Sequence, residues 1–143
     1  MRYSILIIDD SEEDRYLLKR FIKKTGLDTS IVEMVNGEKA MDFLTRYEEH
    51  RKEHPDIVPP LLVFLDVNMP IMDGWEFLNE FRGQRSSIAI QPVVVVMYST
   101  SDLQRDIDRI KKYDFVNSYL VKGTFAPDEL KKTIVDNIAS ATN

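Results

Sequence analysis

The sequence predicts an α/β fold, a doubly wound five-stranded parallel sheet with five helices. Short apolar runs, each long enough for one buried strand, alternate along the chain with segments whose apolar residues recur at helical spacing. The runs are almost continuously apolar, which is typical of parallel strands covered on both faces. A chain of 143 residues with 43% hydrophobic residues is long enough for one such domain and too short for two ordinary ones.

The first part of the chain predicts two strands and two helices. Residues Ile5–Ile8 form the first strand, and Ser11 with the acidic residues after it predicts the N-cap of a helix that stops at Gly26. Residues 31–35 form the second strand, and the second helix begins near residues 36 and 37. Apolar residues at helical spacing mark the buried sides of the two helices: Leu17, Leu18, Phe21 and Ile22, then Ala40, Phe43, Leu44 and Tyr47.

The stretch from residue 48 to residue 60 is the least regular part of the chain. It is highly charged and then contains Pro55, Pro59 and Pro60, so we expect the second helix to run on for a turn and give way to a surface loop insertion over 48–60. His50 and His54 have the spacing of a zinc pair. Without a third placed ligand, however, a solvated helical face is the better interpretation.

The remaining strands and helices follow the same alternation. The strands are Leu61–Leu65, Val93–Val96 and Val116–Val121, and the helices begin at Gly74, near Leu103, and at a first turn that contains Pro127. Their buried sides are marked by Trp75, Phe77, Leu78 and Phe81, by Leu103, Ile107 and Ile110, and by Leu130, Ile134 and Ile138.

Composition argues against several classes of function. The chain has no cysteine, so disulfides and thiolate chemistry are excluded, and this fits a reducing compartment. A formal charge of -5 without a basic stripe argues against binding to nucleic acid. The N-terminus lacks the apolar length of a signal peptide or membrane span. We therefore expect a cytoplasmic protein that binds neither nucleic acid nor membrane.

Polar residues follow four of the expected strands at the point where each strand ends. Asp9 and Asp10 follow the first strand, Asp66 the third, a hydroxyl at Ser99 or Thr100 the fourth, and Lys122 the fifth. In an open parallel sheet the carboxyl ends of the strands form the ligand crevice, so these groups should converge on one site.

The converging groups predict phosphoryl chemistry with a metal ion. Clustered carboxylates repel one another and stay ionised only if a cation lies among them, and an all-oxygen ligand set with few carboxylates favours Mg²⁺. The ammonium of Lys122 and a nearby hydroxyl complete the groups needed to neutralise a phosphoryl group. Asp66 is the best candidate for the nucleophile because it stands alone at the end of the central strand.

Nearly the whole chain resembles the response-regulator receiver domain of two-component signalling, a flavodoxin-like fold. The residues that carry the resemblance are the acidic pair Asp9–Asp10, Asp66 with Asn68–Met69–Pro70 and Asp73–Gly74 after it, and Lys122. The chain departs from the family at Gly123, where the family usually has proline. Its connection between Asp10 and Asp66 is also longer than usual, as in regulators paired with phytochrome-like or hybrid sensor kinases.

The resemblance implies a role for each of these residues. Asp66 would be the phosphoacceptor. Mg²⁺ would be bound by Asp66, by Asp10 directly, by Asp9 through water and by the backbone carbonyl of Asn68. Lys122 would bind the phosphoryl group, and the switch residues would be Ser99, with Thr100 as the alternative, and Tyr119.

The resemblance also implies a function. The chain would be a stand-alone receiver domain, residues 1–143, without an output domain, and a phosphoprotein of a phosphorelay. A sensor histidine kinase or a histidine phosphotransfer protein would supply the phosphoryl group. The protein would then signal by altered binding to a downstream protein or to a second copy of itself. It would not be an enzyme but a switch that assists its own phosphorylation and dephosphorylation.

Two other classes compete with this interpretation. A phosphatase of the haloacid-dehalogenase type also places a nucleophilic aspartate at a strand end, but it needs an acid two residues later, where this chain has Asn68. A receiver-like module that has lost phosphorylation would not be expected to retain all the residues of the expected site.

Overall fold

The computed structural model describes residues 3–56, 60–88, 94–124 and 126–142. Within these ranges five strands form one sheet in the order β2-β1-β3-β4-β5, and every neighbouring pair is parallel. This is the doubly wound sheet that the sequence predicts. Val93, expected in the fourth strand, lies outside the described residues. The strands are β1 Tyr3–Ile8, β2 Thr29–Met34, β3 Pro60–Leu65, β4 Val94–Ser99 and β5 Val116–Val121.

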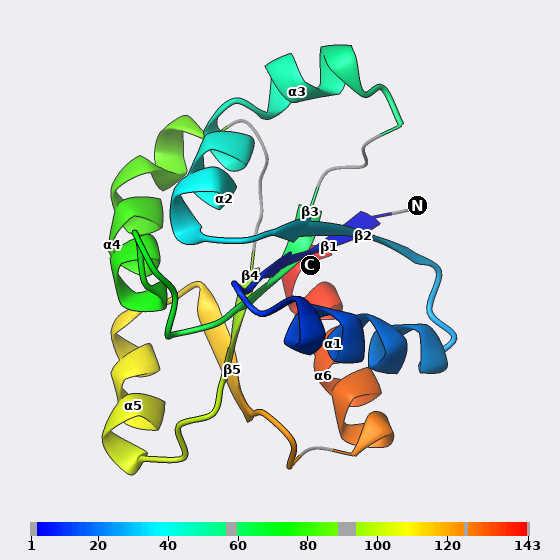
Figure 1. Cartoon of the computed structure of the whole chain (residues 1–143), viewed down its shortest axis with the longest axis vertical. Helices are drawn as coiled ribbons and strands as arrows, with labels where there is room; N and C mark the ends of the chain where they lie inside the picture. Colours follow the sequence, from blue (N-terminus) through cyan, green and yellow to red (C-terminus); the bar gives the residue numbers. More distant parts are fainter. Residues whose placement is uncertain (1–2, 57–59, 89–93, 125, 143) are drawn as a thin grey trace.

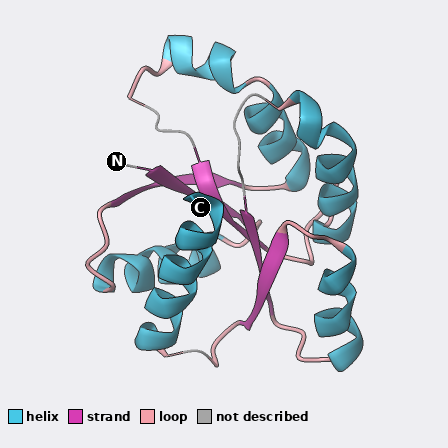
Figure 2. Ribbon diagram, turned by 180° about the vertical axis from the view of Figure 1, so that it is seen from behind, coloured by secondary structure: helices cyan, strands magenta, loops and turns pink. Residues whose placement is uncertain are grey.

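Helices cover both faces of the sheet (Figures 1 and 2). Helices α1 and α6 lie on one face, and α2, α4 and α5 lie on the other. The described part of the chain also contains α3, which lies at one end of the molecule (Figure 1). None of the described helices has both the length and the apolar content that a membrane span requires. The helices are α1 Glu12–Lys24, α2 Gly37–Thr45, α3 Tyr47–Glu53, α4 Gly74–Gln84, α5 Gln104–Arg109 and α6 Pro127–Thr142, with 3₁₀ turns at Arg85–Ser87 and Ile110–Lys112.

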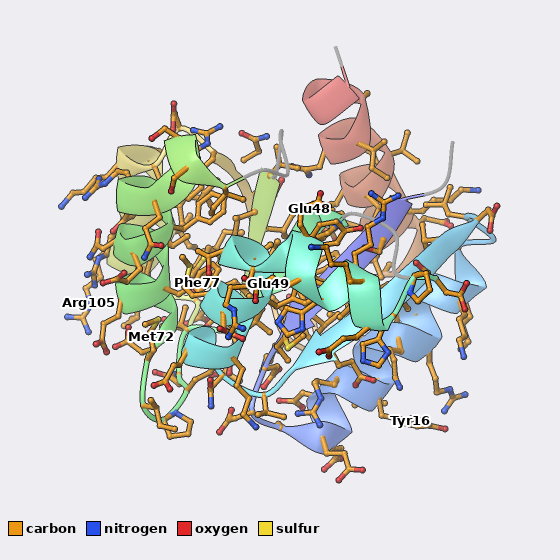
Figure 3. All side chains as sticks on the ribbon, turned by 90° about the horizontal axis from the view of Figure 1, so that it is seen from above. Tyr16, Glu48, Glu49, Met72, Phe77 and Arg105 are labelled. Atoms are coloured by element: carbon orange, nitrogen blue, oxygen red, sulfur yellow. The ribbon has the colours of Figure 1, made fainter. Side chains whose placement is uncertain are left out.

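The central strands serve two cores because successive residues of a strand point to opposite faces. In β1, Leu6 and Ile8 pack on the side of α2 and α4, whereas Ile5 and Ile7 pack on the side of α1 and α6. The strands β3 and β4 alternate in the same way. Phe77 of α4, labelled in Figure 3, is fully buried in the first core. This burial on both faces explains why the strands are continuously apolar in sequence.

Capping residues set the ends of the helices near the strand termini. The Ser11 hydroxyl accepts a hydrogen bond from the Asp14 main-chain N–H at 3.2 Å and caps α1. Asp73 and Glu76 form a reciprocal capping box at the start of α4. Gly26 follows α1 with a φ of 74°, which is a conformation that favours glycine.

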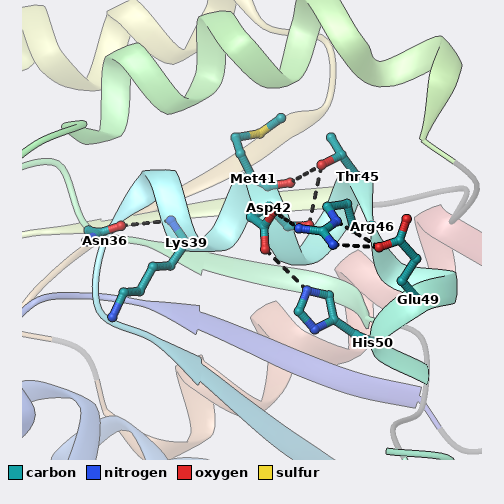
Figure 4. A network of polar contacts seen from close by, with 8 residues as sticks. All are labelled: Asn36, Lys39, Met41, Asp42, Thr45, Arg46, Glu49 and His50. Atoms are coloured by element: carbon teal, nitrogen blue, oxygen red, sulfur yellow. Dashed lines mark hydrogen bonds and ion pairs between the residues drawn. The ribbon is translucent and has the colours of Figure 1, made fainter. Parts of the chain in front are cut away.

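The expected count of five helices is wrong, because the described ranges contain six. Arg46, with φ -113°, interrupts the second helix, so that α2 ends at Thr45 and α3 begins at Tyr47. The Arg46 guanidinium spans the break and pairs with Asp42 at 3.3 Å and Glu49 at 2.6 Å (Figure 4). Tyr47 is buried and anchors α3 against the core.

Part of the expected surface loop is therefore helical. Residues 48–53 belong to α3, and its acidic first turn and basic last turn complement the helix dipole. Residues 57–59 lie outside the described residues. The interpretation of 48–60 as an insertion stays a prediction.

His50 of α3 packs against α2. Its ring nitrogen lies 3.3 Å from an Asp42 carboxylate oxygen (Figure 4), and its ring contacts Phe43 with centroids 5.7 Å apart. Among the described residues, the group of possible metal ligands consists of three aspartates and includes neither His50 nor His54.

Candidate functional site

The sheet itself positions the polar residues that follow its strands. The Asp66 N–H donates a hydrogen bond to the Ile8 carbonyl at 2.9 Å, and the Lys122 N–H donates to the Ser99 carbonyl at 2.7 Å. These bonds continue the β-ladder one residue beyond the strands. Asp9 directly follows β1, so β1, β3, β4 and β5 all contribute to one edge.

Three carboxylates meet at this edge. One oxygen from each of Asp9, Asp10 and Asp66 lies within 4.8 Å of the others. Asp9 and Asp66 are buried, with 0% and 5% of their surface exposed, whereas Asp10 is exposed. Solvent therefore reaches the cluster at Asp10, whereas its other two carboxylates are covered by the protein. Such a set of oxygen ligands fits a hard divalent cation that keeps some of its water.

Asp66 is the member of the cluster whose ionised form is disfavoured by its surroundings. Burial, reinforced by the negative charge of Asp9, raises the pKa of Asp66 from 3.8 to about 7, although Lys122 opposes the rise. In the absence of a cation the Asp66 carboxyl therefore carries a proton through much of the range below neutral pH. A positive charge at the cluster would favour the ionised form.

The ammonium of Lys122 is held among carboxylates. It donates hydrogen bonds to Asp9 at 2.8 Å and Asp14 at 2.9 Å, and it lies 3.4 Å from an Asp66 oxygen. The side chain is 10% exposed, and its nitrogen lies 4.9 Å from the centre of the Tyr98 ring. Burial acts to lower the pKa of Lys122, but these carboxylates outweigh it and raise the pKa, so the ammonium stays charged.

The expected switch residues are joined through Ser101, whose main-chain N–H donates to the Ser99 hydroxyl at 3.1 Å. The Ser101 carbonyl accepts a hydrogen bond from the Tyr119 hydroxyl at 2.8 Å. The Ser101 hydroxyl in turn donates to Asp106 of α5 at 2.6 Å. Ser99 is buried, whereas Thr100 is exposed. The choice of Ser99 over Thr100 stays a prediction.

Asn68 and Gly123 lie in loops beside the carboxylates. Asn68 is exposed, two residues beyond Asp66, and its role as a carbonyl ligand stays a prediction. Gly123 has a φ of 81°, which proline cannot adopt because its ring holds φ near about -65°. The loop after Lys122 therefore uses a glycine conformation at the place where the family usually has proline.

The loop between Asp66 and α4 is tightly constrained. A Cβ atom on Gly74 would lie 2.5 Å from the Asp66 carbonyl oxygen, so glycine is required for this close approach. The Gly74 N–H donates to the Val67 carbonyl at 2.8 Å and closes the loop. Ile71, in the same loop, has a φ of 70° and is 73% exposed. For a β-branched residue this left-handed conformation is strained.

Replacing Ile71 by asparagine should stabilise the protein. Asparagine tolerates the left-handed region, so Ile71→Asn should raise the free energy of unfolding by about 1 kcal/mol. Urea denaturation measures the change as a higher midpoint at constant slope. Ile71→Val is the matched control, because it keeps the β-branch and should leave stability nearly unchanged. Equal stability of Ile71→Asn and the unmodified protein would contradict the statement that the backbone at Ile71 is strained.

Sequence reasoning missed two residues of this site, Asp14 and Ser101. In the sequence Asp14 is one of the acidic residues that follow the N-cap Ser11, and Ser101 is a further hydroxyl residue directly after Ser99 and Thr100. A pattern within α1 could not reveal that Asp14 contacts Lys122, which lies 108 positions away.

The fold and the site define a receiver domain of two-component signalling. Residues 5–135 match the family described as the response regulator receiver domain, and the chain belongs to this family. Response regulator Rcp1 from Synechocystis sp. is 33% identical over 128 residues, which cover 89% of this chain and 81% of Rcp1. Sporulation initiation phosphotransferase F from Bacillus subtilis is 33% identical over 103 residues, covering 72% and 71%.

Solved structures point to the same group of regulators. The Mn²⁺-bound form of Rcp1 is 29% identical with a TM-score of 0.69, covering 92% of this chain and 88% of that one. Bacteriophytochrome response regulator RtBRR is 26% identical with a TM-score of 0.73, covering 96% of this chain and 78% of that one. The chain is therefore a receiver domain related to phytochrome response regulators.

Proposed function

We propose that this protein is a phosphorylation switch that accepts a phosphoryl group onto Asp66 from the phosphohistidine of a sensor kinase or phosphotransfer protein. The observation that carries the proposal is the buried Asp66 carboxylate, flanked by Asp9, Asp10 and the ammonium of Lys122. Membership of the receiver family supports the phosphodonor, because phosphorylation at an aspartate is a general property of that family.

In the proposed reaction an oxygen of the ionised Asp66 carboxylate attacks the phosphorus atom. A P–O bond forms to Asp66 while the P–N bond of the phosphohistidine breaks, and the imidazole nitrogen keeps the electron pair. Lys122 donates hydrogen bonds to a phosphoryl oxygen and offsets the transferred charge. Attack by water on the same phosphorus atom returns Asp66 and inorganic phosphate.

The carboxylate cluster fits the magnesium ion that the family uses. Asp10, Asp66, Asp9 through water and the main-chain carbonyl of Asn68 are the groups that would hold it. When bound, Mg²⁺ supplies positive charge that keeps Asp66 ionised and neutralises phosphoryl oxygens.

Ser101 provides a route by which phosphorylation could alter binding to other proteins. A phosphoryl oxygen at Asp66 would attract the Ser99 hydroxyl, and that hydroxyl now accepts the Ser101 N–H. Ser101 also carries the contacts to Tyr119 of β5 and Asp106 of α5. The surface formed by α5, β5 and α6 is thus the proposed site of altered binding to a downstream protein or a second copy.

The test is phosphoryl uptake from acetyl phosphate with Mg²⁺, followed by intact-mass measurement. The unmodified protein should gain one phosphoryl group, and Asp66→Asn should gain none because the nucleophile is lost. Asp102→Asn is the matched control, since Asp102 is an exposed carboxylate of the loop after β4. A full equivalent of phosphate on Asp66→Asn would exclude Asp66 as the phosphoacceptor.

A further inference from the structure

Asp14 is a carboxylate beside the site that the proposed reaction does not use. It accepts a hydrogen bond from the Lys122 ammonium at 2.9 Å, whereas Asp66 lies 3.4 Å from the same nitrogen. The Asp14 side chain is 35% exposed and the Lys122 side chain 10%. In the absence of a phosphoryl group, Lys122 is thus bound more closely to α1 than to the proposed phosphoacceptor.

The first turn of α1 holds Asp14 in this position. The Asp14 main-chain N–H donates to the Ser11 hydroxyl at 3.2 Å, and the Ser11 N–H donates to Asp9 at 2.9 Å. Asp14 is therefore tied to the same strand-end loop as Asp9. The Asp14–Lys122 contact also forms part of the wall of a cavity of about 350 Å³ at the side of the site.

The ammonium of Lys122 has three N–H donors, and three carboxylates already surround it, so a phosphoryl oxygen would be a fourth acceptor. Asp9 and Asp14 each accept one at hydrogen-bond distance. Asp9 is fully buried and would be costly to leave without its cation, whereas Asp14 borders solvent and can exchange Lys122 for water. A phosphoryl group that recruits Lys122 must therefore compete with Asp14.

We propose that Asp14 is a positioning residue that competes with the phosphoryl group for Lys122 and weakens the binding of a phosphodonor. This inference rests on the proposed phosphorylation of Asp66. The negative charge of Asp14 also repels an incoming phosphate directly. Asp14 thereby sets the phosphodonor concentration at which the switch responds.

The experiment compares phosphorylation rates of Asp14→Asn and the unmodified protein over a range of acetyl phosphate concentrations at saturating Mg²⁺. Asp14→Asn keeps the side-chain shape and removes the charge, so the half-saturating concentration should fall about fivefold while the maximal rate changes less than about twofold. Asp14→Glu keeps the charge, so its half-saturating concentration should equal that of the unmodified protein.

Glu13→Gln is the matched control. Glu13 lies in the same helical turn and is exposed, and the described contacts of Lys122 do not include it. It removes the same charge and should leave the half-saturating concentration unchanged. The difference between Asp14→Asn and the unmodified protein should also shrink as salt is added, because salt screens charge competition at a partly exposed site. A purely structural role of Asp14 would not depend on salt in this way.

Two failures are distinguishable. If the unmodified protein takes up phosphate at Asp66 but Asp14→Asn has an equal or higher half-saturating concentration, the role of Asp14 is wrong and the proposed function stands. The same conclusion follows if Glu13→Gln reproduces the fall. If the unmodified protein takes up no phosphate, both the proposed function and the role of Asp14 are wrong.

Discussion

In buffer without divalent cations, Asp66→Asn should be more stable than the unmodified protein at pH 8 by on the order of 3 kcal/mol, and nearly equal to it at pH 4. The reason is the carboxyl of Asp66. Its pKa is raised from 3.8 to about 7 by burial and by the charge of Asp9. Between these values the folded protein holds a proton that the unfolded chain has lost. Its stability therefore decreases as the pH rises through this window.

Above about pH 7 both states have lost the proton, so the stability difference should become constant. Urea denaturation from pH 4 to pH 8 measures the stability difference between Asp66→Asn and the unmodified protein. The control is Asp102→Asn, which removes an exposed carboxylate, and its stability difference from the unmodified protein should depend little on pH. Adding Mg²⁺ at pH 8 should stabilise the unmodified protein more than Asp66→Asn, because a ligand stabilises the state that binds it. A stability difference that is independent of pH would contradict the raised pKa of Asp66.

Lys122→Met should destabilise the metal-free protein at pH 8 by about 3 kcal/mol, because it removes the cation beside a carboxylate that is fully buried. Asp9 is 0% exposed and accepts a hydrogen bond from Lys122 at 2.8 Å. Methionine fills a similar volume, so the loss reflects charge more than packing. Thermal or urea unfolding measures the change.

Lys111→Met is the matched control for this charge removal. Lys111 pairs with Asp108 at 3.3 Å, but its side chain is 78% exposed, so its loss should cost less than about 0.5 kcal/mol. The double variant Asp66→Asn with Lys122→Met should destabilise the protein by less than Lys122→Met alone, because it also removes one of the carboxylates that lose the Lys122 ammonium. Equal losses for Lys122→Met and Lys111→Met would show that Lys122 is not a buried counter-ion.

Local patterns in the sequence predict most of this fold. The continuously apolar β1 and β3 are recognisable because helices cover both of their faces, and the helix starts at Glu12 and Gly74 follow the capping residues Ser11 and Asp73. The break at Arg46 was missed. No proline or glycine marks this break, and the buried Tyr47 directly follows it.

The strand-end rule also locates the candidate carboxylates. Asp9, Asp10 and Asp66 lie together because parallel strands present their carboxyl ends at one edge, and this follows from the order of strands and helices along the chain. The residue types at those ends already favour a hard cation and phosphoryl chemistry.

The chain by itself thus determines which groups reach the edge of the sheet, because strand identity and polarity are local properties. Only the tertiary structure decides how those groups share their contacts. Lys122 meets Asp14 as well as Asp9 because the first turn of α1 lies beside the residue that follows β5, and Ser101 joins Tyr119 to Asp106 because β4 and β5 are neighbours. Burial decides the charge state of Asp66 in the same way, since desolvation depends on the atoms that surround a carboxyl and not on its neighbours in sequence.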